Sequence, residues 1–486
     1  MSGRTDGGSR VPVQRRFALS PHTGDVTSRI AAIGALAALL TGCAVVQPSS
    51  PPVGPVNSAP PAQLAPSVTP TASPSPSSST PSPSAPPVAA PVPEPIPLPD
   101  AGQLAKVLAK VPTGSVGISA IAVVDPASGQ TLVSREDTPL IPASTMKVLT
   151  SLVAVDTVGA ATTFTTQVVR PSSGRLVLVG GGDPLLTDKK SKSVTKQASL
   201  QALAEQTVVA LQADGVAKVT LGYDTSLFEG PVWHSSWKKT WKVFTARVGA
   251  LSINGGMVSQ WQAHDDPAKV AAEAFAARLK EAGIKVSRIA LQDAPAGAAV
   301  VASVQSAPLA AIAGHVLEVS DNYGAEVLAR HAALATGGTP SFQGGTATMT
   351  TWLKNHGLWA EGMKIDDASG LSRKSKVSVS VLADALALAL VTPRWAAVPR
   401  GLPVAGVNGT LKTRFNDPAE KAGRKVVHAK TGTLQGVASL AGYVTTSDGA
   451  VLTFAAIAND AGRDSAYNWL DRTATAIAKC GCRPAA

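Results

Sequence analysis

A stretch rich in proline, serine and alanine divides this chain of 486 residues into parts of unlike character. Residues 47–100 hold 19 of the 37 prolines and only two charged side chains, Glu94 and Asp100. Such a composition cannot bury a core, and it favours extended polyproline II backbone that rises about 3.1 Å per residue. We therefore predict a disordered linker over residues 47–100, acting as a spacer or as a plain tail, and a compact fold only after it.

The segment before the linker, residues 1–46, has the features of an export signal. Basic residues, among them Arg15 and Arg16, precede an uncharged run from Ile30 to Val46 whose apolar centre matches a signal-peptide core in length. The run contains Leu40-Thr41-Gly42-Cys43, which resembles a bacterial lipobox, a motif whose cysteine is lipidated. An uncleaved anchor is the alternative, since these 17 residues barely span a bilayer. We expect an exported protein of the cell envelope, tethered to the outer face of the cytoplasmic membrane by lipidated Cys43 or by an N-terminal anchor.

The composition of the chain indicates which partners and cofactors its compact part, after residue 100, can have. The net charge of +11 is spread along the chain and is not concentrated in one long basic segment. This argues against a nucleic-acid groove and indicates attraction to an anionic polymer or surface, or solubility alone. The three cysteines and seven histidines form no metal-binding pattern, so no metal or other cofactor is expected. Cys480 and Cys482 suit either a small disulfide or two free thiols.

Strand patterns at both ends of the body predict the fold class. Two apolar runs at 117–124 and 131–135 flank a turn, and two more at 438–445 and 450–458 flank Ser447-Asp448-Gly449. An amphipathic helix is expected at 465–479, and helical patterns fill much of the region between the two hairpins. We predict an α+β fold whose antiparallel sheet is assembled from distant segments and flanked by helices.

The first motif with chemical meaning is Ser144-Thr145-Met146-Lys147, which follows Pro142 and precedes an apolar run. It is predicted to open a helix, where residues three apart lie on the same face, so that the Ser144 hydroxyl and the Lys147 amine can touch. A serine hydroxyl is a poor nucleophile unless a base accepts its proton. Lys147 suits that task if burial and a neighbouring cation lower its pKa. Alone, this pattern is common by chance.

The second motif, Ser320-Asp321-Asn322, lies between two helical patterns at 309–319 and 323–334. The Ser320 hydroxyl can pass a proton to a leaving amine, and the Asn322 amide can hold an acyl chain by hydrogen bonds. The alternative is ordinary helix capping, the usual task of these residue types before a helix.

The third motif, Lys430-Thr431-Gly432-Thr433, lies in a stretch at 426–434 that is predicted to be a strand. Strand alternation puts Lys430 and Gly432 on one face, where an ammonium and nearby hydroxyls can receive a carboxylate while glycine admits a substrate backbone. Lys430 is also expected to be the cation that lowers the pKa of Lys147. His428 shares this face and is interpreted as structural.

Together, in this order and on these elements, the three motifs are specific for acyl-serine chemistry. From about residue 104 to 480 the chain resembles the penicillin-recognising serine enzymes. Segments 180–184, 223–228, 366–373 and 402–411 are similar to one branch, the class C low-molecular-mass penicillin-binding proteins of the D-Ala-D-Ala carboxypeptidase/endopeptidase family. The resemblance implies a penicillin-binding/β-lactamase-like domain that acts on peptidoglycan stem peptides and is acylated by β-lactams.

The resemblance also implies roles for the motif residues. Ser144 attacks the carbonyl between two D-alanines, Lys147 is its base, and Ser320 helps to protonate the leaving amine. Substrate binding is carried by the remaining motif residues Asn322, Lys430, Thr431, Gly432 and Thr433. The alternatives are a β-lactamase, for which no deacylating glutamate is evident, and a catalytically vestigial penicillin-binding sensor or scaffold of the envelope.

The spacing of the motifs predicts a second domain. Ser144 and Ser320 are 176 residues apart, far more than a single domain of this kind needs. We predict a catalytic domain made of residues 101–165 and 301–480, with residues 166–300 inserted. Strands are expected near 176–179, 219–223 and 286–291, and helices at 200–213 and 267–282. The insert is shorter than in fuller members of the family.

Overall fold

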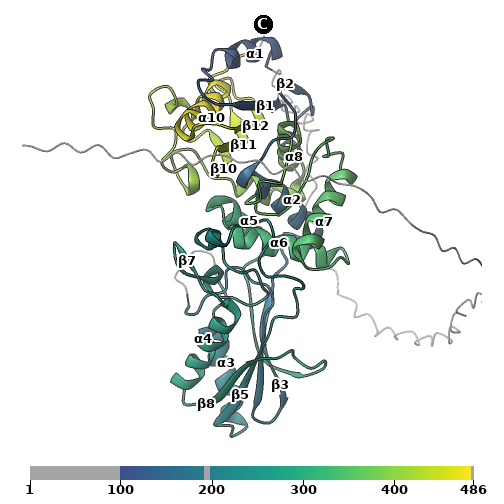
Figure 1. Cartoon of the computed structure of the whole chain (residues 1–486), viewed down its shortest axis with the longest axis vertical. Coiled ribbons are helices and arrows are strands. Elements are labelled where there is room, and N and C mark those ends of the chain that lie inside the picture. Colours follow the sequence, from purple (N-terminus) through teal and green to yellow (C-terminus); the bar gives the residue numbers. More distant parts are fainter. Residues whose placement is uncertain (1–98, 191–196, 483–486) are drawn as a thin grey trace, which may run out of the picture. The chain divides into compact units, whose positions relative to one another are not determined.

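The computed structural model of this chain describes residues 99–190 and 197–482 (Figure 1). The predicted export segment, with Cys43, and all but the last two residues of the predicted linker lie outside the described residues. In the described part, no single helix is both long and apolar enough to cross a membrane, although α8 (Val379–Val391) and the bent segment Pro393–Arg400 meet those criteria as a pair.

A five-stranded antiparallel sheet joins the two ends of the body, as the sequence predicts (Figure 1). Its order is β10-β11-β12-β1-β2, so the C-terminal hairpin pairs with the N-terminal one through β12 and β1. The chain order of the strands is β1 (Ile118–Val124), β2 (Thr131–Arg135), β10 (Val427–Leu434), β11 (Val437–Thr445) and β12 (Val451–Asn459). The α+β prediction is therefore confirmed.

Both faces of this sheet are buried, which explains why β1 and β12 are almost continuously apolar. Along β1, Ala120 and Ala122 face one hydrophobic core while Ile121 and Val123 face a second core on the opposite side. The second core is closed by α1 (Ala101–Ala109) and α10 (Arg463–Ala478). Asp100 begins α1 by accepting a hydrogen bond from the Gln103 N–H at 2.7 Å.

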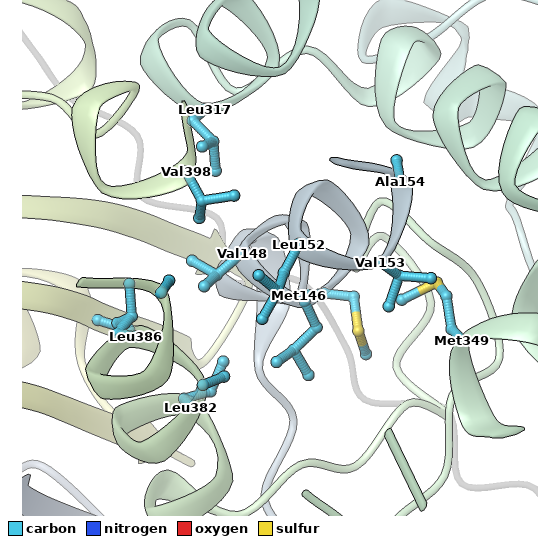
Figure 2. Close-up of a cluster of buried hydrophobic side chains, with 14 of the residues drawn as sticks. Met146, Val148, Leu152, Val153, Ala154, Leu317, Met349, Leu382, Leu386 and Val398 are labelled. Carbon is cyan, nitrogen blue, oxygen red and sulfur yellow. The ribbon is translucent and has the colours of Figure 1, made fainter. Parts of the chain in front are cut away.

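The first core is covered by a helical layer with α2 at its centre (Figure 2). Leu317, Leu382 and Val398 from three neighbouring helices surround Val148 and Leu152 of α2. Because every residue from Met146 to Val155 is buried, α2 is fixed on all sides. The layer consists of α2 (Met146–Val158), α5 (Leu309–Glu318), α6 (Asn322–Ala335), α7 (Phe342–Asn355), α8 and α9 (Ala397–Arg400).

A second five-stranded sheet takes four of its strands from the stretch for which an inserted domain was predicted, apart from Thr165 at the start of the first, whereas its last strand, Ala299–Gln305, lies mostly beyond residue 300. Its order is β8-β5-β4-β3-β9, with parallel pairs β4–β5 and β5–β8 and antiparallel pairs to β3. The strands are β3 (Thr165–Ser172), β4 (Arg175–Val179), β5 (Lys218–Asp224), β8 (Lys285–Leu291) and β9 (Ala299–Gln305), and α3 (Leu200–Ala213) and α4 (Pro267–Glu281) share their hydrophobic core. The division into domains stays a prediction. A small hairpin, β6 (Met257–Ser259) and β7 (Gln262–Ala263), follows this sheet's β5.

Candidate active site

Ser144 lies in a short 3-10 turn, Ala143–Thr145, that leads directly into α2. Ala143, which precedes the serine, has a positive φ of 49°, a left-handed conformation that is uncommon for residues other than glycine. Ser144 lines a cavity of about 1170 Å³, together with Asn322 and Thr433. One residue from each sequence motif therefore borders the same cavity.

Lys147 is fully buried one turn after Ser144 and makes three hydrogen bonds. As an ammonium, its Nζ donates to Ser144 Oγ at 3.0 Å, to Asn322 Oδ1 at 2.6 Å and to the Ser369 carbonyl at 2.7 Å. A neutral amine has only two hydrogens, which match the Asn322 and Ser369 acceptors. With both hydrogens committed there, the lone pair points to the Ser144 hydroxyl, which is the geometry a general base needs.

Burial sets the basicity of Lys147. It lowers the pKa of Lys147 to about 8, and the Asp367, Asp321 and Glu326 carboxylates act in the opposite direction. Burial and the Lys430 cation were both expected to lower this pKa; burial is the first cause, and Lys430 is not among the causes for Lys147. The ammonium of Lys430 is itself fully buried, and burial first, then repulsion by Lys147, lowers the pKa of Lys430 well below its usual value.

The second motif occupies the corner between α5 and α6, as predicted. Asn322 is the first residue of α6, and its Nδ2 donates to the Phe244 carbonyl at 2.9 Å, so its amide is held from both ends. Asp321 precedes the helix but its side chain makes no capping hydrogen bond, so ordinary capping does not explain the motif. Ser320 has a positive φ of 62° and lines an adjoining cavity of about 420 Å³. In residues 99–190 and 197–482 its hydroxyl has no hydrogen-bond partner.

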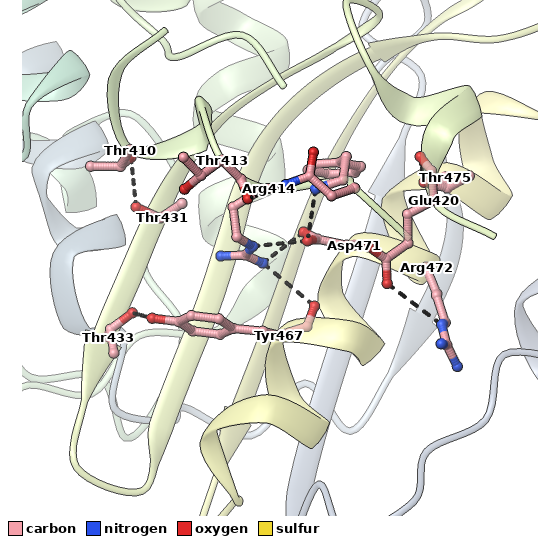
Figure 3. Close-up of polar contacts among 12 residues, drawn as sticks. Thr410, Thr413, Arg414, Glu420, Thr431, Thr433, Tyr467, Asp471, Arg472 and Thr475 are labelled. Atoms are coloured by element: carbon pink, nitrogen blue, oxygen red, sulfur yellow. Dashed lines mark hydrogen bonds and ion pairs between the residues drawn. The ribbon is translucent and has the colours of Figure 1, made fainter. Parts of the chain in front are cut away.

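The third motif forms half of β10, the edge strand of the first sheet. Lys430 Nζ donates to the Thr431 carbonyl at 2.7 Å and stays beneath the cavity instead of lining it. Thr431 Oγ1 donates to Thr410 Oγ1 at 2.8 Å, and Thr433 Oγ1 shares a 2.7 Å hydrogen bond with the Tyr467 hydroxyl (Figure 3). Only Thr433 of these four residues borders the cavity. His428 stacks on Tyr443 with ring centroids 4.6 Å apart.

Gly432 lets β10 approach the Ser144 turn closely. A Cβ at residue 432 would stand 2.1 Å from Ser439 Oγ, 2.7 Å from the Pro142 carbonyl oxygen and 2.9 Å from the Ser144 nitrogen. Ser439 Oγ also donates to the Pro142 carbonyl at 2.6 Å, which ties β11 to the same turn. The strand backbone at residue 432 therefore packs closely against the Ser144 turn.

Sequence reasoning missed several groups that support the site. The Ser369 carbonyl is a backbone atom, and only the similarity of segment 366–373 to the family pointed toward it. Tyr467 is held on α10 by Arg414, whose guanidinium lies 4.2 Å from the ring centroid and pairs with Asp471 at 2.6 Å (Figure 3). An aromatic residue in an amphipathic helix carries no signal of such a role. The structure also pairs Cys480 and Cys482 in a disulfide, a question that the sequence leaves open.

Known proteins resemble this chain over most of the described body. The model of the D-Ala-D-Ala carboxypeptidase 3 (S13) family matches residues 101–260 and 249–479. A carboxypeptidase from Mycobacterium tuberculosis is 33% identical over 396 residues, which are 79% of this chain and 85% of that protein. A D-alanyl-D-alanine carboxypeptidase from Actinomadura sp. (strain R39) is 28% identical over 420 residues, covering 68% of this chain and 76% of the relative.

The fold is shared with penicillin binding protein 4 from Haemophilus influenzae. That crystal structure superposes with a TM-score of 0.63 at 21% identity and covers 76% of this chain and 97% of its own. The penicillin-binding type of fold that the sequence predicts is therefore confirmed. Together, the family match and the identity to the mycobacterial relative show that the chain belongs to the D-Ala-D-Ala carboxypeptidase 3 (S13) family of serine peptidases.

Proposed function

We propose that this chain hydrolyses D-Ala-D-Ala bonds of peptidoglycan stem peptides through an acyl-enzyme on Ser144. The observation that carries the proposal is the orientation of the buried Lys147 amine, which two fixed acceptors aim at Ser144 Oγ. Family membership supports the substrate class. β-Lactams, whose amide resembles the scissile bond, are expected to acylate the same hydroxyl.

In the proposed acylation, the Ser144 proton passes to Lys147 as Oγ attacks the carbonyl carbon of the penultimate D-alanine. The tetrahedral intermediate collapses when the carbon–nitrogen bond breaks. The amine of the terminal D-alanine then takes up the proton, which Lys147 returns with help from Ser320. In the second half-reaction a water gives a proton to Lys147 as it attacks the ester carbonyl carbon. The bond to Ser144 Oγ then breaks, and Lys147 returns the proton to Oγ, which restores the hydroxyl and the neutral amine and releases the shortened peptide.

The oxyanion of this intermediate is proposed to lie between the backbone N–H groups of Ser144 and Thr433. The close approach of β10 at Gly432 to the Ser144 nitrogen supports this placement. Each such donor contributes about 3 kcal/mol to related acyl transfers. Because β10 is an edge strand, an extended peptide can also add along it.

The terminal carboxylate of the substrate is proposed to bind at Thr433, which borders the cavity, and to be attracted by the charge of Lys430. The Lys430 ammonium lies too deep to line the cavity, so it acts through space and through the Thr431 backbone. An incoming carboxylate would raise the pKa of Lys430 and offset its repulsion with Lys147.

The rate constant for acylation of Ser144 by a fluorescent penicillin should rise with pH as Lys147 loses its proton. Below its pKa of about 8 the amine is protonated and cannot accept the serine proton, so the rate constant should rise with pH and be half-maximal near pH 8. Stopped-flow or gel-based labelling between pH 6 and 10 measures this, with circular dichroism to check that the fold persists. A rate that is flat, or that falls as pH rises through 8, contradicts the assignment of the base.

Purified residues 99–486 should convert a pentapeptide ending in D-Ala-D-Ala to the tetrapeptide and free D-alanine. Cross-linked muropeptides, offered in parallel and analysed by mass, distinguish carboxypeptidase from endopeptidase activity. Binding of muropeptides without any cleavage would favour the vestigial sensor or scaffold instead.

We propose that residues 1–46 export the chain and tether it outside the cytoplasmic membrane, with residues 47–100 as a spacer toward the wall. The support is the sequence pattern alone, an apolar run followed by Leu40-Thr41-Gly42-Cys43 and a proline-rich segment. Cys43→Ser should release the protein from membranes if the cysteine is lipidated. Membrane association that withstands this substitution points to an uncleaved anchor.

A further inference from the structure

A carboxyl group that the proposed mechanism does not use is buried directly beneath the site. Glu326 is 1% exposed and lies on α6 four residues after Asn322, so the two side chains share a helix face. Asn322 contacts Lys147 directly. Glu326 faces the loop that supplies the other acceptor of Lys147, the Ser369 carbonyl.

The contacts of Glu326 are specific to that loop. Its Oε1 accepts hydrogen bonds from the Ala368 N–H at 3.1 Å and the Ser369 N–H at 2.8 Å. The carbonyl of the same Ser369 accepts from Lys147 Nζ at 2.7 Å. Both acceptors that orient Lys147 are thus placed by α6, one through Asn322 itself and one through Glu326.

A second carboxylate, that of Asp367, stabilises the loop around Ser369 through hydrogen bonds to the loop's own backbone. Asp367 accepts hydrogen bonds from the Gly370 N–H at 3.1 Å, the Ser372 N–H at 2.7 Å and Trp237 Nε1 at 2.8 Å. Gly370 has a φ of +77°, and a Cβ there would stand 1.9 Å from the Ala143 carbonyl oxygen. The loop is therefore pressed against the turn that holds Ser144, and a small shift of Ser369 would be felt at the nucleophile.

We infer that Glu326 is a positioning residue for this reaction: its carboxyl fixes the Ser369 carbonyl that, with Asn322, turns the Lys147 lone pair toward Ser144. The inference rests on the proposed function, in which Lys147 is the base. The carboxyl also has an electrostatic effect. It is one of three carboxylates that raise the pKa of Lys147, against the lowering by burial.

Several charged or titratable groups face Glu326 and Lys147. Burial and the Asp367 carboxylate raise the pKa of Glu326 to about 7, while the Arg330 guanidinium lowers it. Arg330 is itself buried, with its guanidinium 4.0 Å from the Phe342 ring centroid, and Tyr323 and Asp321 approach from the start of α6. Lys430 is the remaining cation beside Lys147. Near pH 8, where Lys147 titrates, Glu326 is mostly ionised.

Two conservative substitutions of Glu326 separate its positioning of the Ser369 carbonyl from its electrostatic effect on the pKa of Lys147. Glu326→Asp keeps the charge but is one methylene too short to reach both N–H groups, so its maximal acylation rate should fall by about 10-fold or more while the midpoint of its pH profile stays. Glu326→Gln keeps an oxygen at the same reach but loses the charge. It should retain most of the maximal rate, with the midpoint moved to lower pH, because Lys147 loses a stabilising carboxylate.

The experiment measures acylation of purified residues 99–486 by a fluorescent penicillin across pH. Asp384→Asn is the matched control, since this partly buried carboxyl on α8 interacts with Asp137 and not with the site. A Glu326→Asp variant that keeps the wild-type maximal rate, or a Glu326→Gln variant whose maximal rate falls as far as that of Glu326→Asp, overturns the inference. Wild-type protein that is not acylated on Ser144 at all would instead refute the proposed function.

Discussion

Lys147→Met should slow acylation of Ser144 by a β-lactam by about 10²–10⁴-fold, the usual contribution of a general base. Methionine fills nearly the same volume in this fully buried position, but it cannot accept a proton. It also leaves Asn322 Oδ1 and the Ser369 carbonyl without their donor. The rate constant is measured by stopped-flow with a chromogenic cephalosporin, at a pH where wild-type acylation is maximal.

The control for this variant is Lys354→Met on α7, where the lysine packs on Trp359 at the surface. It removes one ammonium and adds one methionine without touching the site, so its acylation rate should equal that of the wild type. Thermal melts of both variants show whether the fold persists. A folded Lys147→Met protein that is acylated at the wild-type rate would mean that another group activates the serine.

Gly432→Ala is the second substitution with a large expected effect. The added methyl would meet two backbone atoms, the Pro142 oxygen at 2.7 Å and the Ser144 nitrogen at 2.9 Å, besides Ser439 Oγ. Backbone cannot rotate away as a side chain can, so β10 must shift and separate the two proposed oxyanion donors. We expect the acylation rate constant to fall by about 10²-fold or more.

Gly314→Ala on α5 provides the matched control. The nearest atom to its added methyl is 3.9 Å away, and alanine is favoured within a helix. This variant should be acylated as fast as the wild type and be at least as stable. Wild-type kinetics in Gly432→Ala would show that the strand does not pack on the Ser144 turn as described.

Elements whose signals are local could be predicted from the sequence. The hairpins at both ends, the helix after Ser144 and the corner at Ser320 all depend on a few consecutive residues, and all are present. β3 and β9 were missed. β3 opens with the polar residues Thr165 and Thr166, and β9 finds its partner strand far back in the chain, with Ala299 opposite Arg170 and Gln305 opposite Thr165.

In the active site too, the contacts between neighbouring residues could be predicted from the sequence, and those that depend on the assembled fold could not. Ser144 and Lys147 meet because they lie three residues apart on one helical turn, so the four-residue motif is enough to predict their contact. The Ser369 carbonyl has no side-chain signature, and Tyr467 meets Thr433 across 34 residues and two strands. Burial of Lys147, which sets its pKa, is a property of the assembled core and not of the motif.

The central claim is that the Ser144 hydroxyl, activated by Lys147, becomes covalently acylated. Its most direct test is to incubate the purified body with penicillin, measure the intact mass, and locate the adduct by peptide mapping. The proposal predicts one penicilloyl group, attached to Ser144, and no adduct in folded Ser144→Ala. An adduct on any other residue, or undiminished labelling of Ser144→Ala, would contradict it.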